Sequence, residues 1–93
     1  MCTGSAFDIV KEEGEDMNIT CIPNIPVEWK RDGQPGKLFM NGRVIKGNSY
    51  LYISNLTTDN SAVYTCHCRD GRILLAEYNV HVRGTFFAIW AVN

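Results

Sequence analysis

The sequence carries almost no net charge, and it lacks low-complexity segments and long hydrophobic runs. Nine basic and ten acidic side chains give a formal net charge of −1, so there is no electrostatic case for nucleic acid or an anionic membrane surface as a partner. Proline and glycine number only 3 and 8, and we find no internal repeat. A chain of 93 residues, 45% hydrophobic and 20% charged, has the composition of one globular domain with one modest core.

Catalytic motifs are also missing. The two histidines, His67 and His81, fall at outward positions of two expected neighbouring strands, where a solvated pair is favoured over a shared metal ion. No serine has a nucleophile motif around it. "RDGQPG" and "RDGR" are turns that open no helix, so they are not phosphate loops, and "KEEGED" is interpreted as an exposed turn rather than a calcium site. We therefore expect no enzymatic activity, no metal and no cofactor.

What the chain has instead is short runs of alternating polarity, with no helical periodicity until the C-terminus. In "MNITC", for example, Met17, Ile19 and Cys21 fall on one face. Similar runs cover 27–31, 49–56, 63–68 and 77–82, separated by glycine-containing turns. About seven short strands, each with one apolar face, cannot bury those faces in a single open sheet. The pattern predicts an all-β fold, an antiparallel β-sandwich.

Four cysteines, an even number in a small domain, suggest disulfides and an oxidising compartment. They are Cys2, Cys21, Cys66 and Cys68, and the residues alone do not select among the three possible pairings. Zinc is the alternative for the cysteines around His67, but their spacing is not the paired C-x-x-C of a structural zinc site. A metal-binding protein using Cys66, His67, Cys68 and His81 is accordingly a weak rival.

Two N-glycosylation sequons support an extracellular location. They are "NIT" at Asn18 and "NLT" at Asn55. The stretch "MCTGSAF" has neither the charged region nor the apolar run of a signal peptide. Two explanations stay open: Met1 replaces a removed signal peptide, which the sequons favour, or the chain is not secreted.

Several features in order resemble the immunoglobulin superfamily. Cys21 lies in an alternating run, Trp29 follows eight positions later, and "LYISNLTTDNSAVYTC" is similar to that family's L-x-I-x-x-L-x-x-x-D-x-x-x-x-Y-x-C block. The resemblance covers residues 7–82 and implies an immunoglobulin-like Greek-key sandwich. It also implies that Cys21 and Cys66 join the two sheets, with Trp29 packed against the disulfide.

The resemblance assigns further roles near the second cysteine. The hydroxyl of Tyr64 is expected to bond to the backbone near Asp59, forming a tyrosine corner, and Asp59 to pair with an arginine, for which Arg43 is the candidate. Because Cys21 and Cys66 are only 45 positions apart, the domain resembles the shorter I-set or C2 type. The N-terminal segment is expected near Cys68, so we predict a second disulfide, Cys2–Cys68; unpaired thiols or an intermolecular bond of Cys2 remain alternatives.

In this family, strands are lettered A to G, and the resemblance puts both sequons on the sheet of strands A, B, E and D. The opposite face, of strands G, F, C and C′, is then open to a protein partner, with Phe39 as an apolar anchor and the hairpin tip 69–72 as a second contact. The predicted partner-binding residues are Glu28, Lys30, Phe39, His67, Arg69, Arg72 and Glu77. Thr65, Asn79 and His81 are expected on the same face.

The predicted domain covers residues 1–83 and is followed by an apolar extension, 84–93. The seven apolar residues 86–92 are too few to span a bilayer. This extension is interpreted as the start of a transmembrane or juxtamembrane segment that continues beyond this chain, as the first strand of another domain, or as a contact in a homodimer.

The resemblance implies an extracellular, cell-surface recognition domain of an immune receptor that binds a protein ligand or co-receptor. A soluble decoy or viral mimic is one alternative. A structural module of a multi-domain adhesion protein is the other.

Overall fold

A computed structural model describes residues 5–21, 27–38, 43–47, 49–68 and 73–84. These ranges form seven strands and two short 3₁₀ helices. The strands are β1 (Ser5–Glu12), β2 (Met17–Thr20), β3 (Val27–Arg31), β4 (Val44–Lys46), β5 (Tyr50–Ile53), β6 (Ala62–Cys68) and β7 (Leu74–Arg83), and the helices are η1 (Pro35–Lys37) and η2 (Thr58–Asn60).

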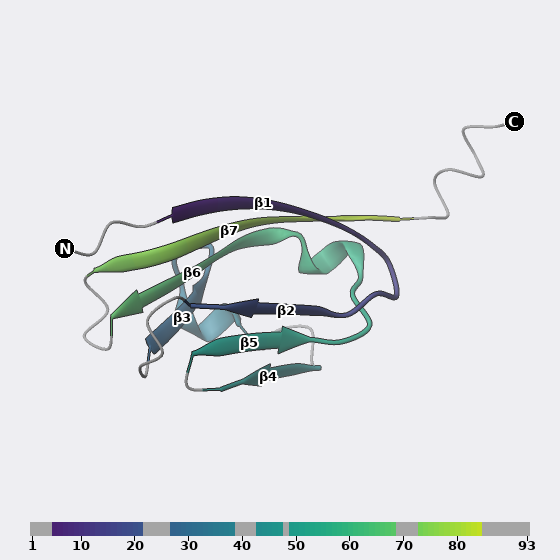
Figure 1. Cartoon of the computed structure of the whole chain (residues 1–93). Helices are drawn as coiled ribbons and strands as arrows, with labels where there is room; N and C mark the ends of the chain where they lie inside the picture. The colour runs from purple at the N-terminus through teal and green to yellow at the C-terminus, as the bar shows by residue number, and fades with distance from the viewer. Residues whose placement is uncertain (1–4, 22–26, 39–42, 48, 69–72, 85–93) are drawn as a thin grey trace, which may run out of the picture.

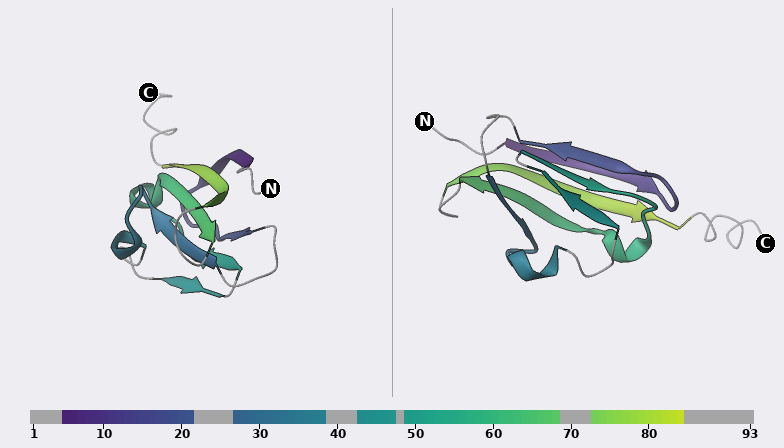
Figure 2. Two further views of the ribbon diagram at one scale, coloured as in Figure 1. Left: turned by 90° about the vertical axis from the view of Figure 1, so that its left-hand side faces the viewer. Right: turned by 90° about the horizontal axis from the view of Figure 1, so that it is seen from below.

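The strands form two sheets packed face to face, which confirms the predicted sandwich (Figures 1 and 2). One sheet has four strands in the order β1-β7-β6-β3, and the other has three in the order β2-β5-β4. The alternation in the sequence explains why the sheets pack this way. Along β2 the residues alternate between buried and exposed, and Leu51 and Ile53 of β5 are buried with them.

The core between the sheets is centred on Trp29, which is 0% exposed. Cys21 and Cys66 form a disulfide across the two layers, the pairing that the family resemblance implies. Both cysteines are buried in the same cluster as Trp29. The link closes a loop with a sequence separation of 45, so it restricts the unfolded chain strongly.

The first strand is where the expectation was wrong. The family resemblance placed it beside strand B, but β1 pairs in parallel with β7, from Ser5 opposite Ala76 to Glu12 opposite Arg83 (Figure 1). The other strand pairs are antiparallel. Ile9 packs against the core in this position, and the side chains of Glu12 and Arg83 form an ion pair. The apolar positions of β1 do not say which sheet the strand joins, because either sheet would bury the same residues.

The tyrosine corner is present at η2. The hydroxyl of Tyr64, which is 1% exposed, donates a hydrogen bond to the backbone carbonyl of Asn60 over 2.8 Å. Burial raises the pKa of Tyr64 above its ordinary value of 10, although the nearby guanidinium of Arg31 opposes the rise. Folding therefore favours the neutral phenol. Its contribution to stability is fully present below pH 10 and is lost as the pH rises through the folded-state pKa.

A Tyr64→Phe variant is expected to lose about 1–3 kcal/mol of unfolding free energy, because the buried carbonyl of Asn60 loses a hydrogen-bond donor. The loss of stability above pH 10 should also be smaller than in the wild type. Urea unfolding at pH 7 and at pH 10.5 measures both effects. Tyr50→Phe, at an exposed position, is the matched control. An equal loss of unfolding free energy in both variants would show that the tyrosine corner adds no stability beyond that of an exposed hydroxyl.

Arg31 contacts the backbone of Asp59, the residue for which the sequence suggested Arg43 as the partner. Its guanidinium lies 5.9 Å from the centre of the Tyr64 ring and donates a hydrogen bond to the backbone carbonyl of Asp59. Arg43 is exposed, and its backbone carbonyl accepts a hydrogen bond from Ser54 N. The ion pair between Arg43 and Asp59 remains a prediction. Nothing in the sequence pattern singled out Arg31, because its contact with Asp59 joins residues 28 positions apart.

Candidate functional site: the outer face of the four-stranded sheet

The outward side chains of β3, β6, β7 and β1 form a ladder of cross-strand rows, which we call the outer face. Each row follows from the strand registers. The first row holds Glu28 and His67, the second Lys30, Thr65, Glu77 and Ala6, the third Val63, Asn79 and Asp8, and the fourth His81 and Val10. The register therefore brings together the four predicted contact residues on described strands: Glu28, Lys30, His67 and Glu77.

Charged side chains of both signs are interspersed with uncharged ones in the upper two rows. Glu28 lies directly opposite His67, and Lys30 lies opposite Thr65, which is in turn opposite Glu77. The two rows therefore place two carboxylates and one ammonium group on the same face. A surface with both signs interspersed favours a partner with the complementary arrangement and disfavours others.

His67 is held neutral at pH 7. Burial lowers its pKa below the ordinary 6.5, and the positive charge of Lys30 lowers it further, while Glu28 acts in the opposite direction. The Nδ1 atom of His67 and the Oγ1 atom of Thr65 are both buried, and neither has a hydrogen-bond partner within the described ranges. Buried polar atoms are almost always paired in folded proteins. The centre of the outer face therefore has unused hydrogen-bonding capacity.

The lower two rows enclose a shallow groove of about 490 Å³. Val10 and Val63 contribute apolar surface to it, and Asp8, Asp32, Asn79 and His81 contribute the polar groups. Asp32, in the turn after β3, has a positive φ of 50° and is tied to β6 by two hydrogen bonds. Its backbone N–H donates to Val63 O over 2.8 Å, and its Oδ1 accepts from Val63 N over 3.0 Å.

Sequence reasoning missed Asp8, Val10, Asp32 and Val63. The first two come from β1, which was expected in the other sheet, and Asp32 was interpreted only as part of a turn. An Asp-Gly pair after an alternating run is the available signal for Asp32, because Asp tolerates a positive φ and its carboxylate can bond a neighbouring backbone N–H.

Metal binding by the two histidines is contradicted. His67 is paired with Leu74, whereas His81 lies at the other end of β7 opposite Val10. Seven residues of strand, roughly 23 Å at about 3.3 Å per residue, separate the two positions. The sulfur of Cys66 is also engaged in the disulfide with Cys21. Across the part of the chain that the structure describes, no group of three or more metal-ligating side chains is found.

Several predicted contacts lie outside the described residues. They are Phe39, Arg69, Arg72 and Cys2, so the C′ anchor, the hairpin tip and the second disulfide stay predictions. The extension 84–93 is described only at Gly84. Among the helices of the described ranges, none has the length and hydrophobicity needed to span a bilayer.

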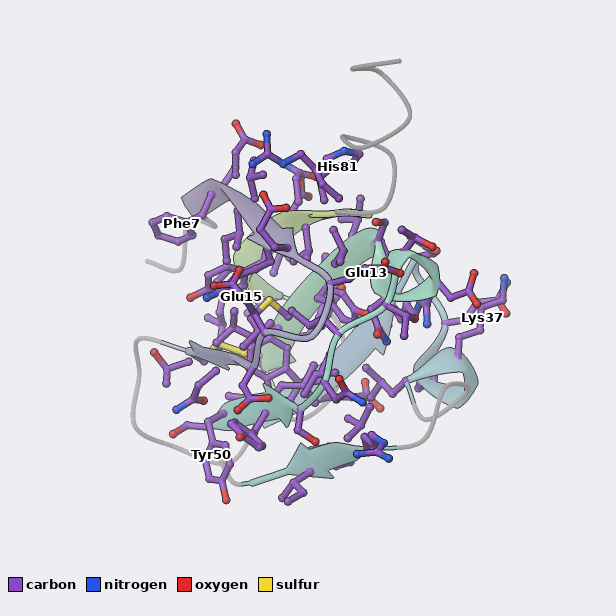
Figure 3. All side chains as sticks on the ribbon, turned by 90° about the vertical axis from the view of Figure 1, so that its right-hand side faces the viewer. Phe7, Glu13, Glu15, Lys37, Tyr50 and His81 are labelled. Carbon is purple, nitrogen blue, oxygen red and sulfur yellow. A yellow bond between two sulfur atoms is a disulfide. The ribbon has the colours of Figure 1, made fainter. Side chains whose placement is uncertain are left out.

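Both sequon asparagines belong to the opposite side of the sandwich. Asn18 is exposed on β2, and Asn55 is exposed just after β5 with a positive φ of 53°. Figure 3 shows the same division for two labelled residues, with His81 on one side of the molecule and Tyr50 of the three-stranded sheet on the other. Carbohydrate on either asparagine would therefore leave the outer face open.

Comparisons with known proteins agree with this geometry. The chain is similar to the CD2-binding domain of CD58, with 17% identity and a TM-score of 0.64 over 84% of this chain and 54% of that one. It is also similar to the first immunoglobulin domain of the mouse polymeric immunoglobulin receptor, with 19% identity and a TM-score of 0.62 over 84% and 90% of the two chains. A novel immune-type receptor 11 fragment from Ictalurus punctatus is 13% identical, with a TM-score of 0.63 over 89% of each chain.

These similarities show that the chain has the immunoglobulin-like fold. The chain spans about half of the length of the CD58 structure, and it covers most of the receptor domain from mouse. No protein-family model matches the sequence.

Proposed function

We propose that this chain is the extracellular recognition domain of a cell-surface immune receptor, and that it binds a protein partner through the outer face. The observation that carries the proposal is the centre of that face. There, the acidic side chains of Glu28 and Glu77 and the basic side chain of Lys30 surround His67 and Thr65 on one sheet face. A partner with the complementary arrangement of charges would be favoured over other partners.

Two further observations support this function. The disulfide Cys21–Cys66 suits an oxidising, extracellular compartment, and both sequons lie on the other sheet. One of the similar structures is described as the CD2-binding domain of CD58, and another as an immune-type receptor fragment. Recognition of a protein is thus a function that this fold supports in other chains.

A cell-binding screen with the domain multimerised on a scaffold tests the proposal. Wild-type multimers are expected to stain a defined cell type, and the Lys30→Glu/His67→Ala double variant is expected to lose that staining by at least about tenfold, which corresponds to roughly 1.4 kcal/mol. The variant reverses one charge in the second row and removes the imidazole of the first row, so both central rows lose complementarity.

Lys46→Glu is the matched control, because Lys46 is exposed on β4 in the other sheet. This control should stain like the wild type. Staining that survives in the double variant would move the contact away from the outer face. Staining that is lost equally in the control would indicate a general charge effect.

A further inference from the structure

One row of side chains crosses the exposed side of the three-stranded sheet, and it joins a sequon to an aromatic ring. Asn18 on β2 is directly opposite Tyr52 on β5, which is directly opposite Ile45 on β4. Directly opposite residues have Cβ atoms about 4.5–5.5 Å apart. A group attached to the side chain of Asn18 therefore starts next to the ring of Tyr52.

The ring of Tyr52 is anchored. Its hydroxyl forms a hydrogen bond with the carboxylate of Asp16, and this bond raises the pKa of Tyr52 above 10 because it stabilises the neutral phenol. The same carboxylate accepts a hydrogen bond from Asn55 N over 2.9 Å, so Asp16 is itself held in place. The hydrogen bond ties the hydroxyl end of the Tyr52 ring to Asp16.

Two large apolar side chains are exposed near this row. Ile45 is 56% exposed and Tyr50 is 38% exposed, and Tyr50 lies on the same side of the sheet, opposite Thr20. Figure 3 shows the Tyr50 side chain pointing away from the sandwich. Uncovered apolar surface on a short-stranded sheet favours association between chains, so a cover at this position has a clear physical benefit.

We propose that an N-linked glycan on Asn18 is that cover, with its first sugar packed on the ring of Tyr52 and the following sugars over Ile45. Asn18 and Thr20 are both exposed on the same side of β2, so the two side chains of the sequon are accessible together. A pyranose ring has one face lined with C–H groups, and the negative face of an aromatic ring attracts such positively polarised groups. The proposal rests on the extracellular location in the proposed function.

The covalent step is the ordinary transfer from a lipid-linked oligosaccharide diphosphate. The amide nitrogen of Asn18 forms a bond to C1 of the sugar and loses one proton, the bond between C1 and the phosphate oxygen breaks, and the lipid diphosphate leaves. No oxidant or reductant is needed. Asn55, the other sequon residue, lies beyond the last paired position of β5, so its glycan has no directly opposite ring to pack on.

The test is a thermodynamic cycle on the full chain, secreted from a eukaryotic host behind an added signal peptide. Thr20→Ala removes the sequon, and Thr20→Ser keeps it. With Tyr52 present, Thr20→Ala is expected to lower the melting temperature by about 4 °C relative to Thr20→Ser, since each kcal/mol shifts a domain of this size by several degrees. With Tyr52→Ala, or Tyr52→Ile if the alanine variant does not fold, the same comparison should give a difference near zero.

Three controls make the outcome decisive. Enzymatic trimming of the glycan to its first sugar should preserve most of the stabilisation. Asn55→Asp, which removes the other sequon and keeps a residue type that tolerates the positive φ of 53°, should change the melting temperature by less than the Thr20→Ala variant. The same Thr20 variants made in bacteria carry no glycan. Their difference in melting temperature measures the effect of the substitution alone, and it is subtracted from the difference measured for the glycosylated variants.

The absence of glycan from Asn18 in glycopeptide mass spectra would overturn the proposal, as would an equal stabilisation with and without Tyr52. Because no binding partner enters the readout, failure here is separate from failure of the outer face as a recognition surface.

Discussion

The double variant Cys21→Ala/Cys66→Ala should lose about 4 kcal/mol of unfolding free energy, the estimate for a closed loop of this length. The loop spans a sequence separation of 45, and both cysteines are buried, at 5% and 0% exposure. Since a small domain has only about 5–15 kcal/mol of stability in total, the variant is expected to be close to unfolding at 37 °C. Urea unfolding without reductant, followed by far-UV circular dichroism, measures the loss.

Cys68→Ala is compared with the double variant, because it keeps the loop closed by Cys21–Cys66 and opens only the predicted Cys2–Cys68 disulfide. A small loss would show that removing a cysteine by itself has little effect, whereas a loss as large as that of the double variant would indicate that the second disulfide forms. A loss below about 1 kcal/mol in the double variant would contradict the prediction, and it would mean that the packing around Trp29 holds the sheets together without the covalent link.

Trp29→Ala should destabilise the domain by about 3–5 kcal/mol, the range for emptying a buried aromatic position. Among the described residues, Trp29 is the largest fully buried side chain, at 0% exposure, and its ring lies 6.3 Å from that of Tyr78. Truncation leaves a cavity between the sheets at the point where the disulfide crosses them. Because Trp90 also contributes to fluorescence, circular dichroism is the better probe of unfolding.

Trp29→Phe distinguishes packing from hydrogen bonding at this position. The indole Nε1 is buried without a hydrogen-bond partner among the described residues, so replacing the ring with phenyl leaves no acceptor stranded. We expect the phenylalanine variant to lose much less stability than the alanine variant. A loss as large as that of the alanine variant would show that the indole N–H donates a stabilising hydrogen bond.

Much of the sandwich could be predicted because its signals are local in the sequence. Period-two alternation fixes which side chains point inward, as Met17, Ile19 and Leu51 illustrate, and these three are buried as expected. The tyrosine corner is similarly local, since Tyr64 and its acceptor Asn60 are only four residues apart.

What the sequence did not predict depends on partners far apart in the chain. The choice of β7 as the neighbour of β1 joins residues about seventy positions apart, and neither strand carries a residue type that specifies the other. The lining of the groove could not be predicted for the same reason, because Asp8 lines the groove only when β1 pairs with β7. The position of Arg31 at Asp59 likewise depends on how the turn after β3 packs against η2.

The parallel pairing of β1 with β7 also has a mechanical consequence. Ser5 lies at one end of the ladder and Arg83 at the other (Figure 1), so a tension applied between these two residues acts along both strands. The hydrogen bonds of a parallel ladder are evenly spaced, and under such a load they share the force together instead of opening one after another. The geometry is that of a shear joint, which resists traction between its two ends better than a hairpin that is peeled from its turn.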